Sequence, residues 1–351
     1  MVGGKLLWWY KTHSRTTIRN LPACSRGTTL SLIGGLILQR PSIFNRATFF
    51  RPEQCWTSRT LSAALVCLLS CLSPAQAEPL KITLAISDEG GAYRRFSESL
   101  LGKLQGDRYA VKIKRAEDAL GGADLYIAVG MKASTQLAGK DIPTLNVFVP
   151  RSGYDKLQRE SVSRASSRSV IYLDQPMERQ IALLLAALPN VRRVGALYTV
   201  TSPELQSLRR LLAEKKIDLY DHGVDQNHSL NEALEKTLGE SEVLFVLPDS
   251  DIYNASTIRN ILLTSYRKQI PLVGISQAYV KAGALCAVFS TPEQVATQAY
   301  AMIEQYADSG RMPAAQYPNE FEVSVNIQVA RSLDLRIKDA AMLHDEIRRA
   351  P

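Results

Sequence analysis

Residues 189–203 read Pro-Asn-Val-Arg-Arg-Val-Gly-Ala-Leu-Tyr-Thr-Val-Thr-Ser-Pro, and this stretch decides the fold. Its apolar part, residues 193–199, has the length and composition of a buried β-strand. An amphipathic helix is expected before it over residues 176–188, because one proline stands near the first turn and another follows the last. The serine and proline that end the stretch suit an N-cap and a first helical turn, and they predict a second helix over residues 203–216. Helix, strand and helix in this order are typical of a parallel sheet.

The same alternation continues on both sides of this unit. Further strands are predicted at residues 81–87, 109–115, 123–130, 144–149, 169–174, 217–224, 243–248, 271–276, 286–290 and 320–325. Further helices are predicted at residues 92–104, 230–238, 255–268, 292–306, 327–333 and 339–349, with a short one ending at residue 137. Because the strands are almost continuously apolar, helices must cover both faces of each sheet. The predicted fold class is α/β, with two doubly wound parallel-sheet lobes of about five strands each.

The charge of the chain is concentrated at its beginning. The 351 residues include 42 Lys and Arg and 34 Asp and Glu, a formal net charge of +8. Residues 1–77 hold nine of these basic residues and one acid, Glu53, so the charge of residues 78–351 is balanced. This balance argues against a nucleic-acid-binding body. Four of the five cysteines also precede residue 78, and Cys286 alone predicts neither an internal disulfide nor a zinc site.

Residues 59–77 have the order of a secretory signal peptide. A positive flank precedes a twelve-residue apolar core at residues 61–72, and Ala75-Gln76-Ala77 follows as a cleavage site. The core is too short for the ~20 residues of a membrane-spanning helix. We therefore expect a periplasmic protein cleaved after Ala77. The alternative is a lipoprotein anchored through Cys71, because residues 68–71 resemble a lipobox.

The basic extension at residues 1–58 is not expected to belong to the fold. Signal peptides rarely carry such an extension, which favours a true start downstream of Met1, near residues 50–58. A transit peptide is the alternative, given the arginine, serine and threonine content and the lack of acids.

The polar loops after the predicted strands are the candidate ligand-binding segments. In doubly wound sheets, ligands bind outside the carboxyl ends of the strands. The loops at these ends are residues 87–91, 130–132, 148–151, 199–202, 248–251 and 276–279. Two lobes that present such loops to each other form a cleft, and pockets favour domain interfaces.

The search for catalytic patterns favours a protein that is not an enzyme. Gly274-Ile-Ser276-Gln-Ala278 is close to the nucleophile elbow of hydrolases, and Asp334 and His344 follow in the order of a triad. The glycines needed for phosphate-binding loops and the spacings of metal ligands are missing. We expect an ordinary loop at Ser276, no metal and no cofactor, and keep a serine hydrolase as the weakest alternative.

Residues 188–198, followed by Ser202-Pro203, resemble the centre of the ABC transporter substrate-binding family that includes tryptophan- and tyrosine-type binding proteins. Further stretches match that family in order: residues 246–249, 270–274 with 279–284, 310–313 and 325–335. The resemblance covers roughly residues 125–340. No single motif in it is specific, and the order and spacing of the motifs carry it.

The resemblance implies a type I periplasmic binding fold with a hinge crossed three times. It implies an N-terminal lobe over residues 78–174 with a helix at 291–309 returning to it, and a C-terminal lobe over residues 175–290 with residues 320–351 returning to it. The lobes would close on a small molecule, such as an amino acid, by hinge motion and deliver it to an inner-membrane ABC permease. The alternative is a periplasmic sensor or accessory protein of the same fold that is not coupled to transport.

The resemblance also places residues of both lobes at the cleft. The implied ligand-binding residues are Ser87, Asp88, Met131, Lys132, Phe148 and Arg151 in the first lobe, and Thr199, Thr201, Ser202, Asp249, Ser276 and Tyr279 in the second. An amino-acid ligand needs a clamp for its carboxylate, for which we expect Arg151 or Lys132. Its ammonium needs an acid, for which we expect Asp249 or Asp88. Four aromatic residues are candidates to stack on its side chain: Phe148, Tyr198, Tyr253 and Tyr279.

Overall fold

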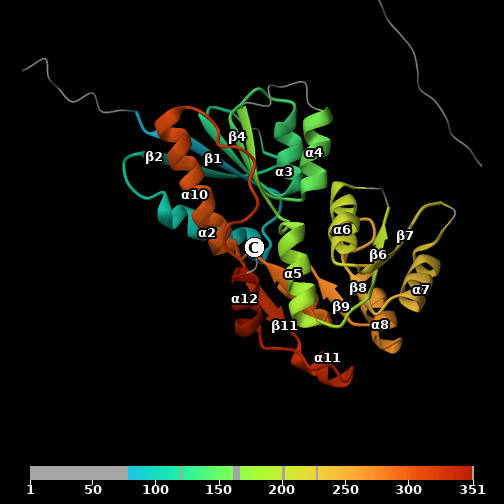
Figure 1. Cartoon of the computed structure of the whole chain (residues 1–351). Coiled ribbons are helices and arrows are strands. Elements are labelled where there is room, and N and C mark those ends of the chain that lie inside the picture. Colours follow the sequence, from blue (N-terminus) through green and yellow to red (C-terminus); the bar gives the residue numbers. More distant parts are fainter. Residues whose placement is uncertain (1–77, 119–120, 161–166, 200–201, 227, 350–351) are drawn as a thin grey trace, which may run out of the picture. The chain divides into compact units, whose positions relative to one another are not determined.

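The computed structural model describes residues 78–118, 121–160, 167–199, 202–226 and 228–349, and we discuss only these (Figure 1). The leader and the extension before it lie outside them. The first sheet has five parallel strands in the order β2-β1-β3-β4-β5. Its strands are β1 (Leu80–Ile86), β2 (Tyr109–Arg115), β3 (Leu125–Val129), β4 (Thr144–Val149) and β5 (Arg168–Tyr172). Its own helices are α2 (Gly91–Lys103), α3 (Met131–Ala138) and α4 (Arg151–Glu160).

The second sheet has six strands in the order β11-β10-β9-β8-β6-β7. They are β6 (Arg193–Tyr198), β7 (Asp218–Gly223), β8 (Val243–Phe245), β9 (Leu272–Gly274), β10 (Cys286–Phe289) and β11 (Glu322–Val325). The helices of this part are α5 (Met177–Ala187), α6 (Pro203–Glu214), α7 (Leu230–Glu240), α8 (Ile258–Arg267), α9 (Gln277–Ala282), α11 (Ile327–Ser332) and α12 (Ala340–Arg349). All neighbouring strands are parallel except β10 and β11.

Helices cover both faces of each sheet, as the apolar strands require. In the first sheet, Leu84 faces a core that includes Phe96 of α2, whereas the next residue, Ala85, faces a core that includes Leu137 of α3. In the second sheet, the two cores take their helical residues from α5, α6 and α12 on one face and from α7 and α8 on the other. The predicted doubly wound architecture is therefore present in both sheets.

Helix α10 (Pro292–Ser309) follows the second sheet in sequence but packs on the first. Ala299, Met302 and Ile303 are buried in the same core as Phe96 and Leu84, and Figure 1 shows α10 lying along α2. Its start is fixed by a capping box in which the Thr291 hydroxyl accepts from the amide of Gln294, as the sequence pattern there would favour. The chain then returns to the second sheet at β11.

Three segments consequently connect the two sheets, and hydrogen bonds tie them together. Gln175 in the first segment donates from Nε2 to Ser290 Oγ in the second, at 2.9 Å. The Ser290 hydroxyl donates to the carbonyl of Glu320 in the third, at 2.5 Å. The third segment also pairs with the first sheet, since Gln316 forms a parallel bridge with Ile171 of β5.

Three elements differ from the sequence predictions. An ordinary loop was expected at Ser276, but helix α9 begins directly after it; its six residues include one buried side chain, Val280, too few to give an apolar period. Helix α4 was not predicted, because its ten residues include only two buried side chains, Tyr154 and Leu157, and the apolar periodicity is weak. Strand β11 was predicted, but it runs antiparallel to β10 at the edge of the second sheet. Within the described ranges, we find no helix whose length and hydropathy would let it cross a bilayer.

Candidate functional site

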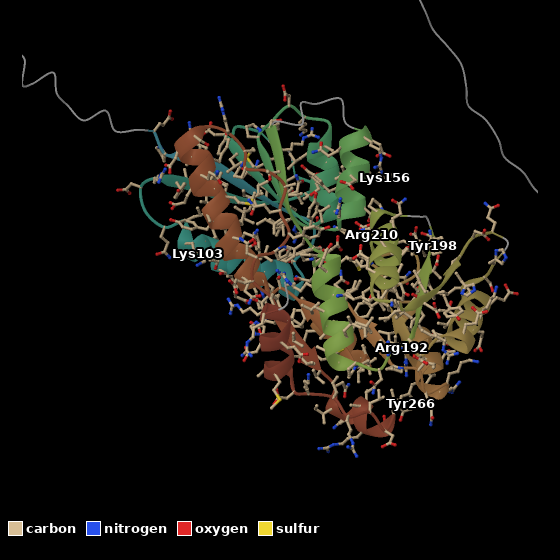
Figure 2. The ribbon with its side chains drawn as sticks, in the orientation of Figure 1. Lys103, Lys156, Arg192, Tyr198, Arg210 and Tyr266 are labelled. Atoms are coloured by element: carbon tan, nitrogen blue, oxygen red, sulfur yellow. The ribbon has the colours of Figure 1, made fainter. Side chains whose placement is uncertain are left out.

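A cleft of about 680 Å³ opens where strands of the two sheets end. From the first sheet, Met131 at the start of α3 and the segments that follow β4 and β5 line it. From the second sheet, the segments that follow β6, β8 and β9 do so. Figure 2 shows Lys156 on α4 and Tyr198 at the end of β6, two of the side chains that line it. The lining residues are Met131, Pro150, Ser152, Gly153, Asp155, Lys156, Arg159, Leu173, Tyr198, Thr199, Ser202, Pro203, Leu247, Pro248, Asp249, Ser250, Asp251, Tyr253 and Ile275.

Charged side chains line both sides of the cleft. Lys156 and Arg159 are exposed on α4, and within the described chain neither forms an ion pair. Asp249 and Asp251 come from the second lobe, on the loop after β8. Asp155 also lines the cleft on α4, where it lies 3.8 Å from Arg151. The cleft therefore offers groups of both signs, which suits a ligand that carries both charges.

The Asp249 carboxylate joins two loops of the second lobe that line the cleft. Its Oδ2 accepts from the backbone amide of Thr199 at 2.8 Å and from the Thr199 hydroxyl at 2.7 Å. Its Oδ1 accepts from the amides of Asp251 at 3.0 Å and Ile252 at 3.4 Å. The carboxylate thus links the loop after β6 to the loop after β8, and it lines the cleft with its hydrogen bonds already made.

Replacing Asp249 with alanine is expected to lower the free energy of unfolding by about 2 kcal/mol, because several hydrogen bonds to a carboxylate are lost at once. Asp251→Ala is the matched control, since its side chain lies exposed in the same loop and forms no hydrogen bond or ion pair with the described residues. Urea unfolding of both variants measures the difference. Equal stability of the two would contradict a linking role for Asp249.

A second, smaller pocket adjoins the cleft and shares Leu173, Pro248 and Ile275 with it. We call it the inner pocket; its volume is about 280 Å³. Its remaining lining residues are Asp174, Gln175, Gln180, Ser276, Tyr279 and Val288. Ser276 and Tyr279, both expected at the site, therefore lie here rather than in the larger cleft.

Asp174 is the buried acid of the inner pocket, with 8% of its surface exposed. Its Oδ2 accepts from the backbone amide of Arg151, at 2.6 Å, where α4 begins. Burial in a low-dielectric environment disfavours the charged form and raises the pKa of Asp174 to about 7, and the nearby charge of Glu204 acts in the same direction.

Five of the six residues expected in the first lobe do not line either pocket; Met131 does. The Ser87 hydroxyl accepts from the amide of Ala133 at 2.9 Å, and Asp88 lies in the same turn. Lys132 forms an ion pair with Glu117. Phe148 is buried edge-to-face against Phe96, with ring centroids 5.3 Å apart.

The Arg151 guanidinium, which was expected to bind the carboxylate of the ligand, interacts with other side chains of the protein. Its Nη1 donates to the Tyr317 hydroxyl at 2.8 Å, and its Nε lies 3.8 Å from Asp155. Thr201 lies outside the described residues. Among the expected residues of the second lobe, Thr199, Ser202 and Asp249 line the cleft, and Ser202 also caps α6 by accepting from the amide of Leu205.

Four charged residues near the pockets were missed by sequence reasoning. Three of them lie on α4, the helix that the weak periodicity concealed: Asp155, Lys156 and Arg159. Asp174 ends a predicted strand, so the rule that ligands bind at the carboxyl ends of strands would have found it. Nothing in the sequence showed that the backbone amide of Arg151, twenty-three residues earlier, would donate a hydrogen bond to the Asp174 carboxylate.

The hydrolase alternative finds no catalytic geometry. Ser276 is the N-cap of α9, whereas His344 lies on α12, where its ring stacks on Phe321 at 4.8 Å. In the part of the chain that the structure describes, no hydrogen bond joins Ser276 to His344. Nor do three or more His, Cys, Asp or Glu side chains gather among the described residues in a way that would hold a metal ion.

Comparison with known proteins places this geometry in a family. The family model described as ABC transporter substrate binding protein matches residues 169–345. A tyrosine-binding protein from Clostridioides difficile (strain R20291) is 20% identical over 210 residues, which cover 57% of this chain and 59% of that protein. The chain therefore spans less than two thirds of that relative's length.

Solved structures share the fold. The ABC domain in complex with L-Trp from Streptococcus pneumonia has a TM-score of 0.57 and 17% identity, over 76% of this chain and 98% of that one. A ligand-free, open substrate-binding protein with adhesive properties from Clostridium difficile has a TM-score of 0.56 and 17% identity, over 75% and 96% of the two chains. The predicted α/β fold with two parallel-dominated sheets, of the type I periplasmic binding kind, is confirmed.

Proposed function

Because the chain belongs to the ABC transporter substrate binding protein family, whose members are extracytoplasmic binding proteins and not enzymes, we propose that it binds a small organic molecule in the cleft and delivers it to an ABC permease. The observation that carries the proposal is the cleft of about 680 Å³, which lies within the range of small-molecule sites and is lined by both lobes. Closure would bring the two lobes together around the ligand by bending the three connecting segments.

The proposed ligand is an aromatic amino acid or a similar zwitterion. The relatives named above bind tyrosine and tryptophan. Lys156 and Arg159 offer positive charge to a carboxylate, and the half-buried ring of Tyr198 offers apolar surface to a ring. The ligand would thus meet cationic side chains of α4 on one side and the Tyr198 ring of the second lobe on the other.

A thermal-shift screen of the protein against amino acids, peptides, nucleosides and vitamins tests the proposal. A ligand that binds the folded state raises the melting temperature, because it stabilises by RT ln(1 + [L]/Kd). We expect L-tyrosine or L-tryptophan to give the largest shift. A screen in which no compound raises the melting temperature would contradict the proposed function.

Reversing the charge at Lys156 is expected to weaken binding of the amino acid about tenfold, because an attractive charge near the carboxylate becomes a repulsive one. Lys103→Glu is the matched control: it makes the same change in net charge at an exposed position on α2, away from the cleft (Figure 2). Isothermal titration of Lys156→Glu and Lys103→Glu separates the local effect from the change in total charge. Similar affinities of the two variants would mean that the carboxylate of the ligand does not bind near Lys156.

We also propose that the protein acts after export. The sequence of residues 59–77 supports a signal peptide cleaved after Ala77, and residues 68–71 support lipidation of Cys71 as the alternative. N-terminal sequencing of the mature protein distinguishes the two, since a soluble product would begin at Glu78.

A further inference from the structure

The inner pocket is rich in hydrogen-bond acceptors and carries a buried carboxylate. Asp174 is more than nine-tenths buried, and one of its oxygens accepts from Arg151. Gln180 donates one of its two amide N–H groups to the carbonyl of Gln175, at 2.8 Å, and its side-chain oxygen is an acceptor. None of the described residues that line this pocket is Lys, Arg or His. A pocket of this composition favours a cationic group over an anionic one.

A second buried carboxylate lies close enough to act on the first. Glu204, in the first turn of α6, is 7% exposed, and both of its carboxylate oxygens are buried without a hydrogen-bond partner among the residues that the structure describes. Its charge acts on Asp174 and also on Arg151. Burying a carboxylate charge without an ion-pair partner is costly, so these two carboxylates create a demand for positive charge.

Arg151 meets this demand only in part. Its backbone amide donates to Asp174, but its guanidinium donates to the Tyr317 hydroxyl and lies near Asp155. The positive charge of Arg151 lowers the pKa of Asp174, but less than burial raises it. The phenols of Tyr172 and Tyr317, whose pKa values the Asp174 charge helps to raise, bring no positive charge. A cation supplied by the ligand would complete the set.

We propose that Asp174 is the specificity-determining residue that receives the protonated amine of the ligand in the inner pocket. At 280 Å³ the pocket is near the lower limit of about 300 Å³ for whole ligands, so it accepts one group while the adjoining cleft holds the remainder. The carboxylate of the same ligand then faces Lys156 and Arg159. This inference rests on the proposed function and assigns the amine to Asp174, not to Asp249 or Asp88.

Paired ligands that differ only in the amine test the assignment. L-tyrosine is compared with 3-(4-hydroxyphenyl)propanoate, and L-tryptophan with indole-3-propanoate, by isothermal titration at pH 8. We expect the wild-type protein to bind each amino acid at least tenfold more tightly than its deaminated analogue. Asp174→Asn should reduce this ratio to nearly one while leaving affinity for the analogues unchanged. Asp251→Asn is the matched control and should keep the ratio.

The pH profile of the wild-type protein gives a readout that needs no variant. Only ionised Asp174 attracts the amine, and burial raises the pKa of Asp174 to about 7. The ionised fraction, and with it the affinity for L-tyrosine, should therefore fall about tenfold from pH 8 to pH 6. The analogue, which lacks the amine, should not show this loss, and neither should Asp174→Asn with L-tyrosine.

The outcomes separate this inference from the function on which it rests. If the wild-type protein binds L-tyrosine or L-tryptophan but Asp174→Asn keeps both the ratio and the pH profile, the amine is bound elsewhere and the inference is wrong. If the wild-type protein binds neither amino acid, the proposed function and this inference fall together. Circular dichroism of Asp174→Asn confirms that a loss of affinity does not come from unfolding.

Discussion

Gly130→Ala is expected to destabilise the protein by about 3 kcal/mol, because glycine alone adopts the backbone conformation at this position without strain. Gly130 joins β3 to α3 with φ 86° and ψ 170°. A Cβ atom there would also lie 2.7 Å from the Tyr93 hydroxyl and 2.9 Å from the Ser87 hydroxyl. The Tyr93 ring packs against Phe148, with centroids 5.7 Å apart, so it cannot move away freely. Chemical unfolding measures the change.

The same helix offers the control for this prediction. Gly139, just after α3, has φ −84° and ψ −1°, and a Cβ atom built on it meets nothing within 4 Å. Gly139→Ala should therefore leave the free energy of unfolding unchanged to within about 0.5 kcal/mol, or raise it slightly. If Gly130→Ala were as stable as Gly139→Ala, the strained turn after β3 would not exist in solution.

Ile303→Ala is expected to cost about 3 kcal/mol, in the range measured for truncating a fully buried aliphatic side chain. Ile303 is 0% exposed and lies in the core that α10 shares with α2 and the first sheet. The measurement also tests the connection between the two sheets, because α10 is the part of the chain that returns from the second sheet to the first. Differential scanning calorimetry and urea unfolding both report it.

Gln305→Ala is the control: it tests whether any substitution in α10 lowers the free energy of unfolding, or only one on its buried face. Gln305 is exposed on the same helix, two residues further along. Its substitution should change stability by less than about 0.5 kcal/mol. A cost below 1 kcal/mol for Ile303→Ala would mean that α10 does not pack on the first sheet as described.

Local patterns were sufficient to predict most of the elements. Helix α6 begins at Pro203 behind the Ser202 cap, and β6 covers residues 193–198, close to the prediction from the quoted stretch. Such elements are specified by short-range periodicity and by capping residues, both of which are visible in one sequence. Helix α4 escaped this reasoning because only Tyr154 and Leu157 are buried on it.

Contacts between distant residues decided which of the expected polar side chains already have partners within the protein. Asp249 was expected to receive an ammonium, but Thr199, fifty residues earlier, takes one of its oxygens. Lys132 was expected near the ligand, but it pairs with Glu117. Such pairs form only when the chain has folded, so the residue type alone could not exclude them.

The sequence by itself determined the fold class and the edge of each sheet at which a ligand would bind, because strand length, helix periodicity and the direction of parallel strands are local properties. Tertiary structure alone decided that Asp174 would be buried beside Glu204 and capped by Arg151. The physical reason is that burial and charge depend on neighbours brought from β5, α4 and α6. A local sequence pattern therefore cannot predict which carboxylate will be buried without a cation beside it.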